Sequence, residues 1–250
     1  MDRAFYAEYS VLERKHWWFL VRANIIMDRV RILSEGRRDL KILNVGSGPS
    51  YTSQLLEEFG EVKSIEYDQI CADMVKETLG IDIEQGSITE LRFEDNQYDL
   101  VTAFDVVEHV EDDALAVSEL HRVCKPGGHV LITIPAFMSL WSHHDVVNQH
   151  FKRYRKPEIR ELFANLSGSE KHQSYFNSIL FIPIWTFRTL SNLFPKSWTR
   201  SGAGSDATVG ETTSPVDALL KFVFGLERPL MRMGIKFPFG VSFLYLFKKK

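Results

Sequence analysis

The sequence contains few cysteines, no long apolar run and little net charge. Cys71 and Cys124 are its only cysteines, too few for a disulfide framework, and this favours a reducing compartment. The segment Met1–Tyr9 lacks the apolar core of a signal peptide, and the apolar run Ile179–Trp185 is shorter than the roughly 20 residues of a membrane-spanning helix. The net charge of −3 gives no general attraction for nucleic acid, so we expect none as a partner. These absences favour a cytoplasmic protein.

The composition is that of an ordinary globular domain. Of the 250 residues, 44% are hydrophobic and 25% are charged. A chain of this length buries roughly 70–75% of the surface that its unfolded form exposes, so it can hold a core without disulfides or metal. We therefore expect one domain, with an appendage at most.

Short apolar segments alternate with helical patterns between residues 41 and 134. Strands that alternate with helices at this spacing predict right-handed crossovers and a parallel sheet covered on both faces. The predicted fold class is therefore α/β, with a doubly wound, mostly parallel sheet. The predicted strands are Lys41–Val45, Val62–Glu66, Ile81–Glu84, Tyr98–Phe104 and His129–Ile134, and the predicted helices are Tyr51–Phe59, Asp68–Leu79 and Glu111–Cys124.

The regions on either side of this alternation differ from it. Residues 1–40 are predicted to form a helical lid, in which Trp18–Leu33 has the apolar spacing of an amphipathic helix. Residues 41–135 form the core, and residues 136–250 form a helical, aromatic lid and cap over the substrate. Within this cap we expect a mobile loop at 196–215, a helix at Val216–Met233 and a last strand at 241–247.

A glycine-rich turn follows the first predicted strand. In an open parallel sheet, ligands bind at the carboxyl ends of the strands where the strand order reverses. Gly46 and Gly48 allow the backbone to approach a ligand there. Glu66 ends the second strand 18 residues after Gly48, near the roughly 20-residue offset of an acid that binds a ribose diol. By itself the turn is weak evidence, because a turn that only needs positive φ also explains the two glycines.

Several segments of the sequence resemble the motifs of a known protein family. Asn44-Val45-Gly46-Ser47-Gly48-Pro49-Ser50 and Ile65-Glu66-Tyr67 resemble the first two motifs of the class I S-adenosylmethionine-dependent methyltransferases. Gly86-Ser87-Ile88 is similar to the turn that reads the adenine amino group in that family. Two later segments match further motifs of the family, in the family's order. They are Asp105-Val106-Val107-Glu108-His109-Val110 and the segment 119–128. The resemblance covers about residues 40–135 and is closest to the small-molecule branch that includes ubiquinone-type enzymes.

This resemblance implies a seven-stranded, Rossmann-like methyltransferase fold and S-adenosylmethionine as the cofactor. Three positions depart from the family pattern: Asn44 stands where an acid is usual, Ser50 replaces a third glycine, and Ser87 stands where an Asp often accepts from adenine. We expect these changes to weaken cofactor binding without abolishing it. The predicted cofactor-binding residues are Asn44, Gly46, Ser47, Gly48, Glu66, Tyr67, Ser87, Ile88, Phe104, Asp105 and Val106.

Two alternatives to a methyltransferase stay open at this stage. A nicotinamide-dependent oxidoreductase shares the sheet, the turn and the ribose acid, but its fingerprint has a glycine where this chain has Tyr51, and it has no place for Asp105–Val110. The other alternative is a non-catalytic module that binds the cofactor and docks on a membrane or a partner protein.

The implied reaction is an in-line displacement in which an acceptor atom attacks the methyl carbon of the sulfonium. Alignment by the protein contributes roughly 7–11 kcal/mol, and an oxygen acceptor gains about 10²–10⁴-fold from a general base. The candidate bases and their partner are His144, Asp145, His150 and His109, and the candidate substrate contacts are Trp17, Arg22, Arg153 and Tyr154.

Other roles for these residues remain open. Hydrogen bonds from the segment Trp141–Arg155 can simply tie down the lid, and His109 can pack over the cofactor. His144, Asp145 and His150 can be arranged around a metal, but their spacing on a loop is not diagnostic, and we predict no metal site.

The last third of the chain is rich in aromatic residues. Tyr175–Phe194 and the lysines 248–250 suit an interfacial helix with attraction to anionic lipid, and the same aromatic residues suit a pocket for a prenylated or lipid-linked acceptor. An ordinary hydrophobic core explains them as well. We predict O-methylation of a small-molecule, lipid-linked or glycan-linked acceptor, with peripheral contact to the inner face of a membrane as an option.

Overall fold

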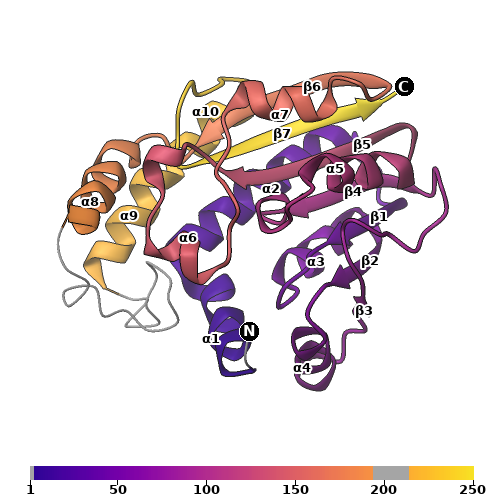
Figure 1. The fold of residues 1–250 in the computed structure, drawn as a ribbon, viewed down its shortest axis with the longest axis horizontal. Coiled ribbons are helices and arrows are strands. Elements are labelled where there is room, and N and C mark those ends of the chain that lie inside the picture. Colours follow the sequence, from indigo (N-terminus) through magenta and orange to yellow (C-terminus); the bar gives the residue numbers. More distant parts are fainter. Residues whose placement is uncertain (1–2, 194–213) are drawn as a thin grey trace.

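The structure is a computed structural model that describes residues 3–193 and 214–250, and Figure 1 shows its fold. One sheet of seven strands runs through it in the order β3-β2-β1-β4-β5-β7-β6. The strands are β1 (Leu40–Val45), β2 (Gly60–Glu66), β3 (Glu84–Gln85), β4 (Tyr98–Phe104), β5 (Cys124–Pro135), β6 (Gly168–Phe176) and β7 (Ser242–Lys249).

The adjacent strands β3, β2, β1, β4 and β5 pair in parallel. Strand β7 lies between β5 and β6 and is antiparallel to both. This arrangement confirms the predicted α/β class with a seven-stranded, mostly parallel sheet. The last strand begins and ends one to two residues later than expected, at Ser242 and Lys249.

Helices cover both faces of the sheet. The described helices are α1 (Arg3–Lys15), α2 (Trp17–Ser34), α3 (Tyr51–Leu56), α4 (Gln69–Leu79), α5 (Asp113–Val123), α6 (His143–Val147), α7 (Lys156–Phe163), α8 (Phe181–Leu193), α9 (Pro215–Gly225) and α10 (Glu227–Arg232), with 3-10 turns η1 (Glu57–Phe59), η2 (Val107–His109) and η3 (Met138–Leu140). None of the helices in the described ranges is long and apolar enough to cross a membrane.

Strand residues alternate between two cores, as the period of two in a strand requires. On β4 and β5, Val101 and Val130 belong to the cluster with α5 and α7, whereas Leu100 and Leu131 belong to the cluster with α2 and α9. Both faces are therefore buried, which explains the nearly continuous apolar runs of the central strands.

The helix expected at Val216–Met233 is two helices, α9 and α10. Pro229 lies in the first turn of α10 and has no N–H to donate to the carbonyl of Gly225, so a single continuous helix is disfavoured. The mobile loop expected at 196–215 lies outside the described residues, except for Ser214 and Pro215, where α9 begins.

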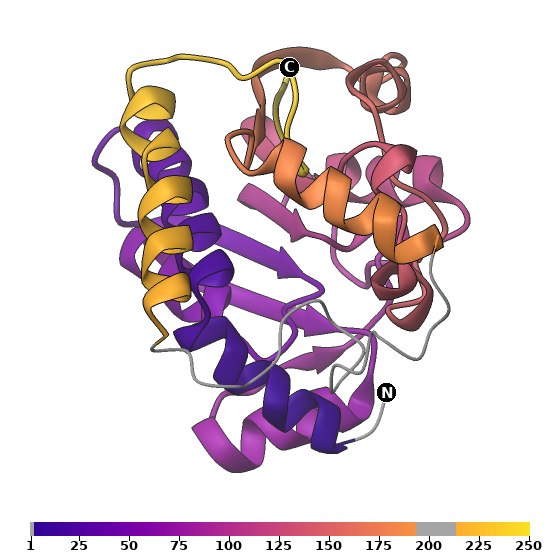
Figure 2. The same ribbon diagram turned by 90° about the vertical axis from the view of Figure 1, so that its left-hand side faces the viewer.

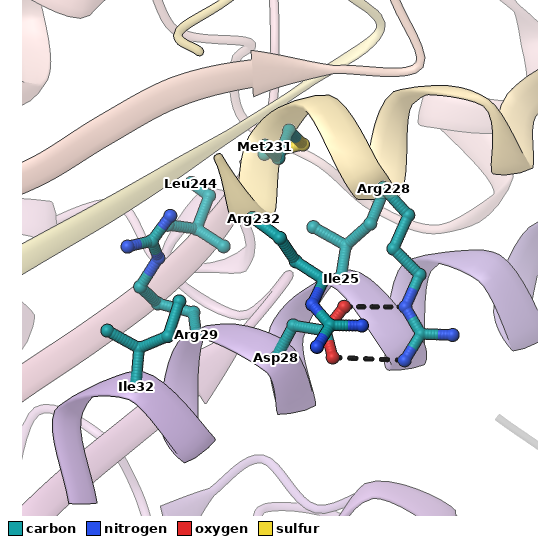
Figure 3. A pocket seen from close by; sticks show the side chains of 8 residues that line it. All are labelled: Ile25, Asp28, Arg29, Ile32, Arg228, Met231, Arg232 and Leu244. Carbon is teal, nitrogen blue, oxygen red and sulfur yellow. Dashed lines mark hydrogen bonds and ion pairs between the residues drawn. The ribbon is translucent and has the colours of Figure 1, made fainter. Parts of the chain in front are cut away.

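An ion pair fastens α10 to α2. Arg228 donates from Nε and Nη2 to the two oxygens of Asp28, at 2.5 Å and 3.0 Å (Figure 3). Met231 and Ile25 pack beside this pair in the small groove between the two helices. The N-terminal and C-terminal segments of the chain are thus joined on one face of the sheet.

The strand order determines where in the sheet a ligand site is expected. Crossovers from β1 lead outward to β2 on one side, and β4 and β5 extend the sheet on the other side. The loops after β1 and β4 therefore diverge at the carboxyl ends of adjacent strands, which is where open α/β sheets bind ligands.

Candidate active site

The turn after β1 has the backbone that a nucleoside ligand requires. Gly46 and Gly48 have φ of 66° and 52°, in the left-handed region. A Cβ at position 46 would lie 2.5 Å from Cγ2 of Val106, so the turn and the loop after β4 touch at this glycine. Ser50, which replaces the family's third glycine, adopts a φ of 71° itself, so the serine keeps the left-handed backbone of that position.

Glu66 closes the turn from the end of β2. Its carboxylate accepts hydrogen bonds from the backbone N–H of Gly48 at 2.9 Å and of Asp68 at 3.2 Å. Burial raises the pKa of Glu66, and these backbone donors act in the opposite direction. A carboxylate has about four lone-pair sites, so two remain for the hydroxyls of a ribose. The glycine turn and Glu66 therefore fit an adenosine group.

The loop after β3 carries two of the residues that the sequence predicted to contact the cofactor, Ser87 and Ile88. The Ser87 hydroxyl lies 2.8 Å from that of Thr89, and Ile88 is buried. Tyr67 is largely exposed at the rim, beyond Glu66. The sequence predicted that Ser87, Ile88 and Tyr67 contact the cofactor, and these roles stay predictions.

Asn44 has its amide engaged inside the fold. Its Nδ2 donates to the Ser53 hydroxyl at 2.8 Å, and its Oδ1 accepts from Thr102 at 2.8 Å. Only 1% of Asn44 is exposed. The side chain thus joins β1 to β4 and α3 and supports the turn from below, while the charge that the family usually has at this position is missing.

Arg22 and Asp105 form a pair between the N-terminal helices and the end of β4. Arg22 Nη2 lies 2.7 Å from Asp105 Oδ2 and 3.1 Å from the Thr133 hydroxyl, and its guanidinium lies over the Trp18 ring. Asp105 itself has a φ of 58°. Arg22 is buried by this pairing, so α2 is held directly over the loop after β4.

A cavity of about 500 Å³ opens beside this pair. It brings together six predicted site residues: Trp17, Asp105, His109, His144, His150 and Arg153. Aromatic and aliphatic side chains from α1, α2, α8 and α9 complete its walls, including Tyr9, Phe19, Phe187 and Leu220. Tyr154, predicted to contact substrate, is not among the lining residues, because its buried hydroxyl donates to Asp113 at 3.0 Å.

Asp145 accepts several of the hydrogen bonds within the segment between β5 and α7. It is completely buried and accepts from His150 Nδ1 at 2.8 Å, from Arg153 Nε at 2.7 Å and Nη2 at 3.0 Å, and from the backbone of Ser142 at 2.8 Å. Although burial opposes it, hydrogen bonding by His150 and Arg153 holds the pKa of Asp145 well below its usual range. A charged carboxylate can only accept, so His150 carries its proton on Nδ1 and presents Nε2 to the cavity.

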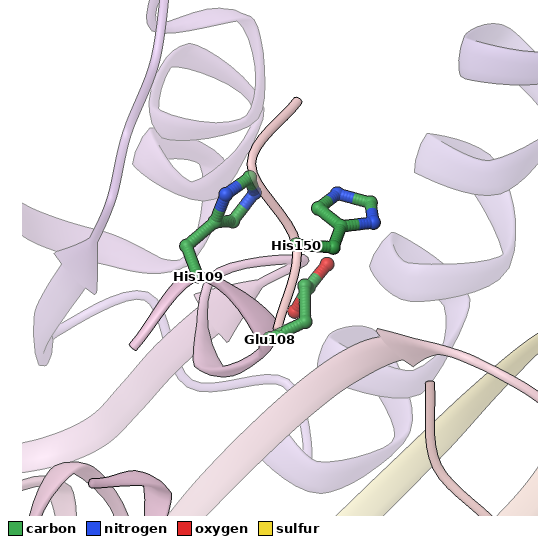
Figure 4. Close-up of side chains that lie close together, drawn as sticks. All are labelled: Glu108, His109 and His150. Carbon is green, nitrogen blue, oxygen red and sulfur yellow. The ribbon is translucent and has the colours of Figure 1, made fainter. Parts of the chain in front are cut away.

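Glu108, His109 and His150 converge at the floor of the cavity (Figure 4). Their ligand atoms lie within 4.8 Å of one another, and among the described residues this is the group that could hold a metal ion. Burial and the neighbouring His150 lower the pKa of His109 to about 4, so its imidazole is neutral at pH 7. Burial and Asp105 raise the pKa of Glu108 well above its usual range.

Three residues of this region were not predicted from the sequence. Glu108 is completely buried, and neither carboxylate oxygen has a hydrogen-bond partner among the described residues. Tyr9 lines the cavity, and Glu13 lies against the glycine turn. The sequence places Glu108 beside His109 at the expected methyl-transfer site but gave it no role, whereas nothing in the sequence of α1 indicates that Tyr9 and Glu13 reach the site.

Comparison with known proteins agrees with this geometry. Residues 43–132, from β1 to β5, match a family described as a methyltransferase domain. Residues 43–132 form a class I methyltransferase domain. The match contains the glycine turn, Glu66 and the loop after β4, and it confirms the resemblance and the S-adenosylmethionine cofactor expected from the sequence.

Curated relatives of this methyltransferase domain match over part of their length. A probable S-adenosylmethionine-dependent methyltransferase of Mycolicibacterium smegmatis is 32% identical over 126 residues, covering 50% of this chain and 48% of that protein. A demethylmenaquinone methyltransferase of Staphylococcus aureus is 30% identical over 157 residues, covering 56% of this chain and 62% of that protein. The chain thus spans about half to three fifths of the length of these relatives.

The likeness to solved structures extends over nearly the whole chain. The YcgJ protein of Bacillus subtilis superposes with a TM-score of 0.56 at 16% identity, covering 92% of this chain and 99% of that one. At this identity the likeness shows the fold alone. The nicotinamide-dependent alternative gains no support from these similarities.

Proposed function

We propose that the protein transfers the methyl group of S-adenosylmethionine to an oxygen atom of a small, apolar acceptor. The observation that carries this proposal is the contact between two parts of the site. The glycine turn meets the loop after β4 at Gly46 and Val106, and that same loop supplies Asp105, Glu108 and His109 to the cavity. A nucleoside on the turn therefore ends beside a cavity that can hold the acceptor.

The cofactor would be held by three parts of the methyltransferase domain. The backbone of Gly46–Gly48 lies against the nucleoside, Glu66 accepts from the ribose hydroxyls, and the loop at Ser87 and Ile88 flanks the adenine. When bound, S-adenosylmethionine supplies an electrophilic methyl group. The protein's own contribution is then orientation of the acceptor and removal of its proton.

His150 is the general base that the geometry favours. Asp145 accepts from Nδ1 and so fixes the ring with Nε2 toward the cavity, which is the logic of an imidazole oriented by a carboxylate. Arg153 holds the same carboxylate through two nitrogens and prevents it from rotating away. His144 lies on the cavity wall with its ring 6.0 Å from that of His150, and it is placed to contact the acceptor.

An oxygen acceptor explains why a base is present. A phenol or hydroxyl must lose a proton as it attacks, and a positioned imidazole accelerates such a step by about 10²–10⁴-fold. His109 is neutral at pH 7, and its pKa of about 4 makes it a weak base, so it is better suited to contact the acceptor than to take its proton.

The surface around the cavity favours a lipid-linked or prenylated acceptor. Apolar side chains of α8 and α9, the helices that border the cavity, are widely exposed, and in Figure 2 the two helices stand on opposite sides of the view. The most exposed apolar residues of these two helices, here called the α8–α9 surface, have exposed fractions from 49% to 66% and are Ile182, Phe187, Leu190, Val216, Leu219 and Phe222. Such a surface suits peripheral contact with the inner face of a membrane, from which an apolar acceptor would enter.

A relative supports this substrate class by its name. The Staphylococcus aureus relative is a demethylmenaquinone methyltransferase. An acceptor of comparable apolar character fits the aromatic lining of the cavity here. We propose a cytoplasmic location with peripheral membrane contact, as expected from the sequence.

The first experiment separates cofactor binding from turnover. Calorimetry with S-adenosylhomocysteine tests the cofactor site, and incubation with radiolabelled S-adenosylmethionine and either an organic or an aqueous cell extract tests transfer. We expect binding, and label in an alkali-stable product of the organic extract. Binding without transfer to either extract would favour a non-catalytic module, and transfer only to the aqueous extract would exclude a lipid-linked acceptor.

The second experiment tests membrane contact. We expect the protein to float with vesicles that contain phosphatidylglycerol, and the variants Ile182→Asn and Phe222→Asn to float less. Leu115→Asn is the control, because Leu115 is an apolar, exposed residue on α5 that does not line the cavity. Equal flotation of all variants would remove the α8–α9 surface as the contact.

A further inference from the structure

Glu13 places a carboxylate of the N-terminal helix against the glycine turn. Its Oε1 lies 3.9 Å from the point that a Cβ of residue 48 would occupy. The residue is 8% exposed, and its Oε2 is buried without a hydrogen-bond partner in the part of the chain that the structure describes. An unsatisfied buried carboxylate costs stability, so its presence at a binding turn calls for a ligand.

The groups around Glu13 leave its charge poorly compensated. The backbone N–H of Tyr51 at the start of α3 favours its charged form, and Nη1 of Arg14 lies 3.9 Å from its Oε2. Arg14 is otherwise occupied with Ser10 at 3.1 Å and Gln54 at 3.0 Å. Burial consequently raises the pKa of Glu13 to about 7.

The ionisable groups that face Glu13 from the other elements do not change this balance. Arg22 on α2 stabilises the charged form, but it is paired with Asp105. Glu66 at the end of β2 disfavours the charged form. Tyr9 on α1 and Cys71 on α4 are neutral near pH 7 because their pKa values are raised.

We infer that Glu13 binds the ammonium group at the amino-acid end of S-adenosylmethionine. This inference rests on the proposed function, and it gives α1 a direct part in holding the cofactor. In the proposed function the ribose lies at Glu66 and the methyl group lies at the cavity beside Asp105. The turn at Gly48 is between these two places, and Glu13 lies against that turn. It would supply the negative charge that is missing at Asn44, whose amide is engaged with Ser53 and Thr102.

A purely structural role makes a different prediction. If Glu13 only accepts from the Tyr51 N–H, glutamine serves equally well, because its amide oxygen is also an acceptor. If Glu13 binds an ammonium group, glutamine fails, because the neutral amide loses the charge-assisted part of the bond. The substitution Glu13→Gln therefore tests whether the negative charge of Glu13 is needed for binding, because it changes the shape of the side chain very little.

The experiment compares three ligands by calorimetry. S-adenosylhomocysteine has both the ammonium and the carboxylate, its decarboxylated analogue S-adenosyl-3-thiopropylamine keeps only the amine, and 5′-methylthioadenosine has neither. We expect Glu13→Gln to raise the Kd of the first two roughly 10-fold or more and to change the Kd of the third less than about 2-fold. Glu8→Gln on the same helix is the control and should change none of them.

Dependence on pH gives an independent readout. A cation binds the ionised carboxylate, so the affinity of the wild type for S-adenosylhomocysteine should fall as pH falls through about 7, approaching 10-fold per pH unit below it. Calorimetry in buffers of different ionisation enthalpy should show proton release on binding near pH 7. Both effects should disappear in Glu13→Gln.

The outcomes distinguish this inference from the proposed function. If the wild type binds none of the three ligands, the cofactor site itself is wrong. If the wild type binds S-adenosylhomocysteine and Glu13→Gln binds it equally well with the same pH dependence, the role of Glu13 is overturned and the cofactor site stands. An equal loss for all three ligands would assign Glu13 to the turn alone, and thermal unfolding of the variant identifies a general folding defect.

Discussion

His150 and Asp145 are joined by a hydrogen bond of 2.8 Å between Nδ1 and Oδ1, and Arg153 holds the same carboxylate from Nε at 2.7 Å. The carboxylate is completely buried, whereas the imidazole lines the cavity. The pair thus connects the interior of the lid segment to the place where the acceptor would bind. It gives one of the three predicted histidine candidates a fixed orientation, and it makes that histidine the first target for substitution.

Replacement of His150 by glutamine should slow methyl transfer without loss of cofactor binding. We expect the single-turnover rate to fall about 10²–10⁴-fold, because the acceptor would lose its base. The measurement is transfer of a labelled methyl group to the active extract fraction, with S-adenosylhomocysteine affinity determined in parallel. His143→Gln is the control, since His143 is exposed beside the same segment. An unchanged rate in His150→Gln would exclude this histidine as the base.

Replacement of Glu66 by glutamine should weaken cofactor binding. Glu66 accepts from Gly48 and Asp68, and the amide of glutamine would oppose one of these donors while losing the charge that we propose binds a ribose. We expect the Kd of S-adenosylhomocysteine to rise roughly 10–100-fold. Glu61→Gln, an exposed position on the same strand, should leave it unchanged. Equal affinities for both variants would contradict the ribose assignment.

Replacement of Gly46 by alanine should cost more stability than the same change at Gly80. The two glycines have nearly equal φ, 66° and 68°, so the strain of a left-handed alanine is common to both. A Cβ at 46 collides with Val106 at 2.5 Å, whereas one at 80 has no neighbour within 4 Å. We expect Gly46→Ala to lower the free energy of unfolding by about 1–3 kcal/mol beyond Gly80→Ala in urea titrations. Equal losses would show that Val106 can move aside.

Protonation of His172 should destabilise the folded protein in mild acid. His172 on β6 is 6% exposed, and its Nε2 lies 3.0 Å from Nη2 of Arg29. Burial and Arg29 lower the pKa of His172 to about 4, below the value of about 6.5 in the unfolded chain. Between these values the unfolded chain binds more protons, so the free energy of unfolding falls as pH falls from 6.5 toward 4.

The test compares His172→Gln with the wild type. Between pH 7 and pH 5 the wild type should lose about 2 kcal/mol more of its free energy of unfolding than the variant. Urea titrations at the two pH values measure this difference. His143→Gln serves as the control and should follow the wild type, and a His172→Gln variant that loses as much stability as the wild type would contradict the lowered pKa.

The cofactor half of the protein could be predicted from its sequence because its signals are local. The apolar runs at Lys41–Val45 and Tyr98–Phe104, the glycines between the first strand and helix, and the acid at Glu66 each follow from residues close together in the chain. Prediction of helix bounds was less accurate in the aromatic last third of the chain. The interfacial helix expected within Tyr175–Phe194 begins at Phe181, so Pro183 lies in its first turn, where the missing N–H of proline costs nothing.

The acceptor side was only partly predictable because its residues come from distant segments. The histidines of the lid were found as candidates, but their sequence spacing did not show which of them faces Asp145. Glu13 and Tyr9 reach the site through the packing of α1 against the turn and the cavity, and no local pattern in that helix indicates it.

The sequence by itself determined the α/β class, the glycine turn after the first strand and the position of the acid at Glu66, because strand periodicity and glycine conformations depend on neighbouring residues. Only the tertiary structure decided which histidine is oriented, which carboxylates are buried without partners and which helices enclose the cavity. These properties depend on burial and on distances between segments more than 100 residues apart, as in the pairing of Arg22 with Thr133. Desolvation and the direction of a hydrogen bond exist only when the chain is folded.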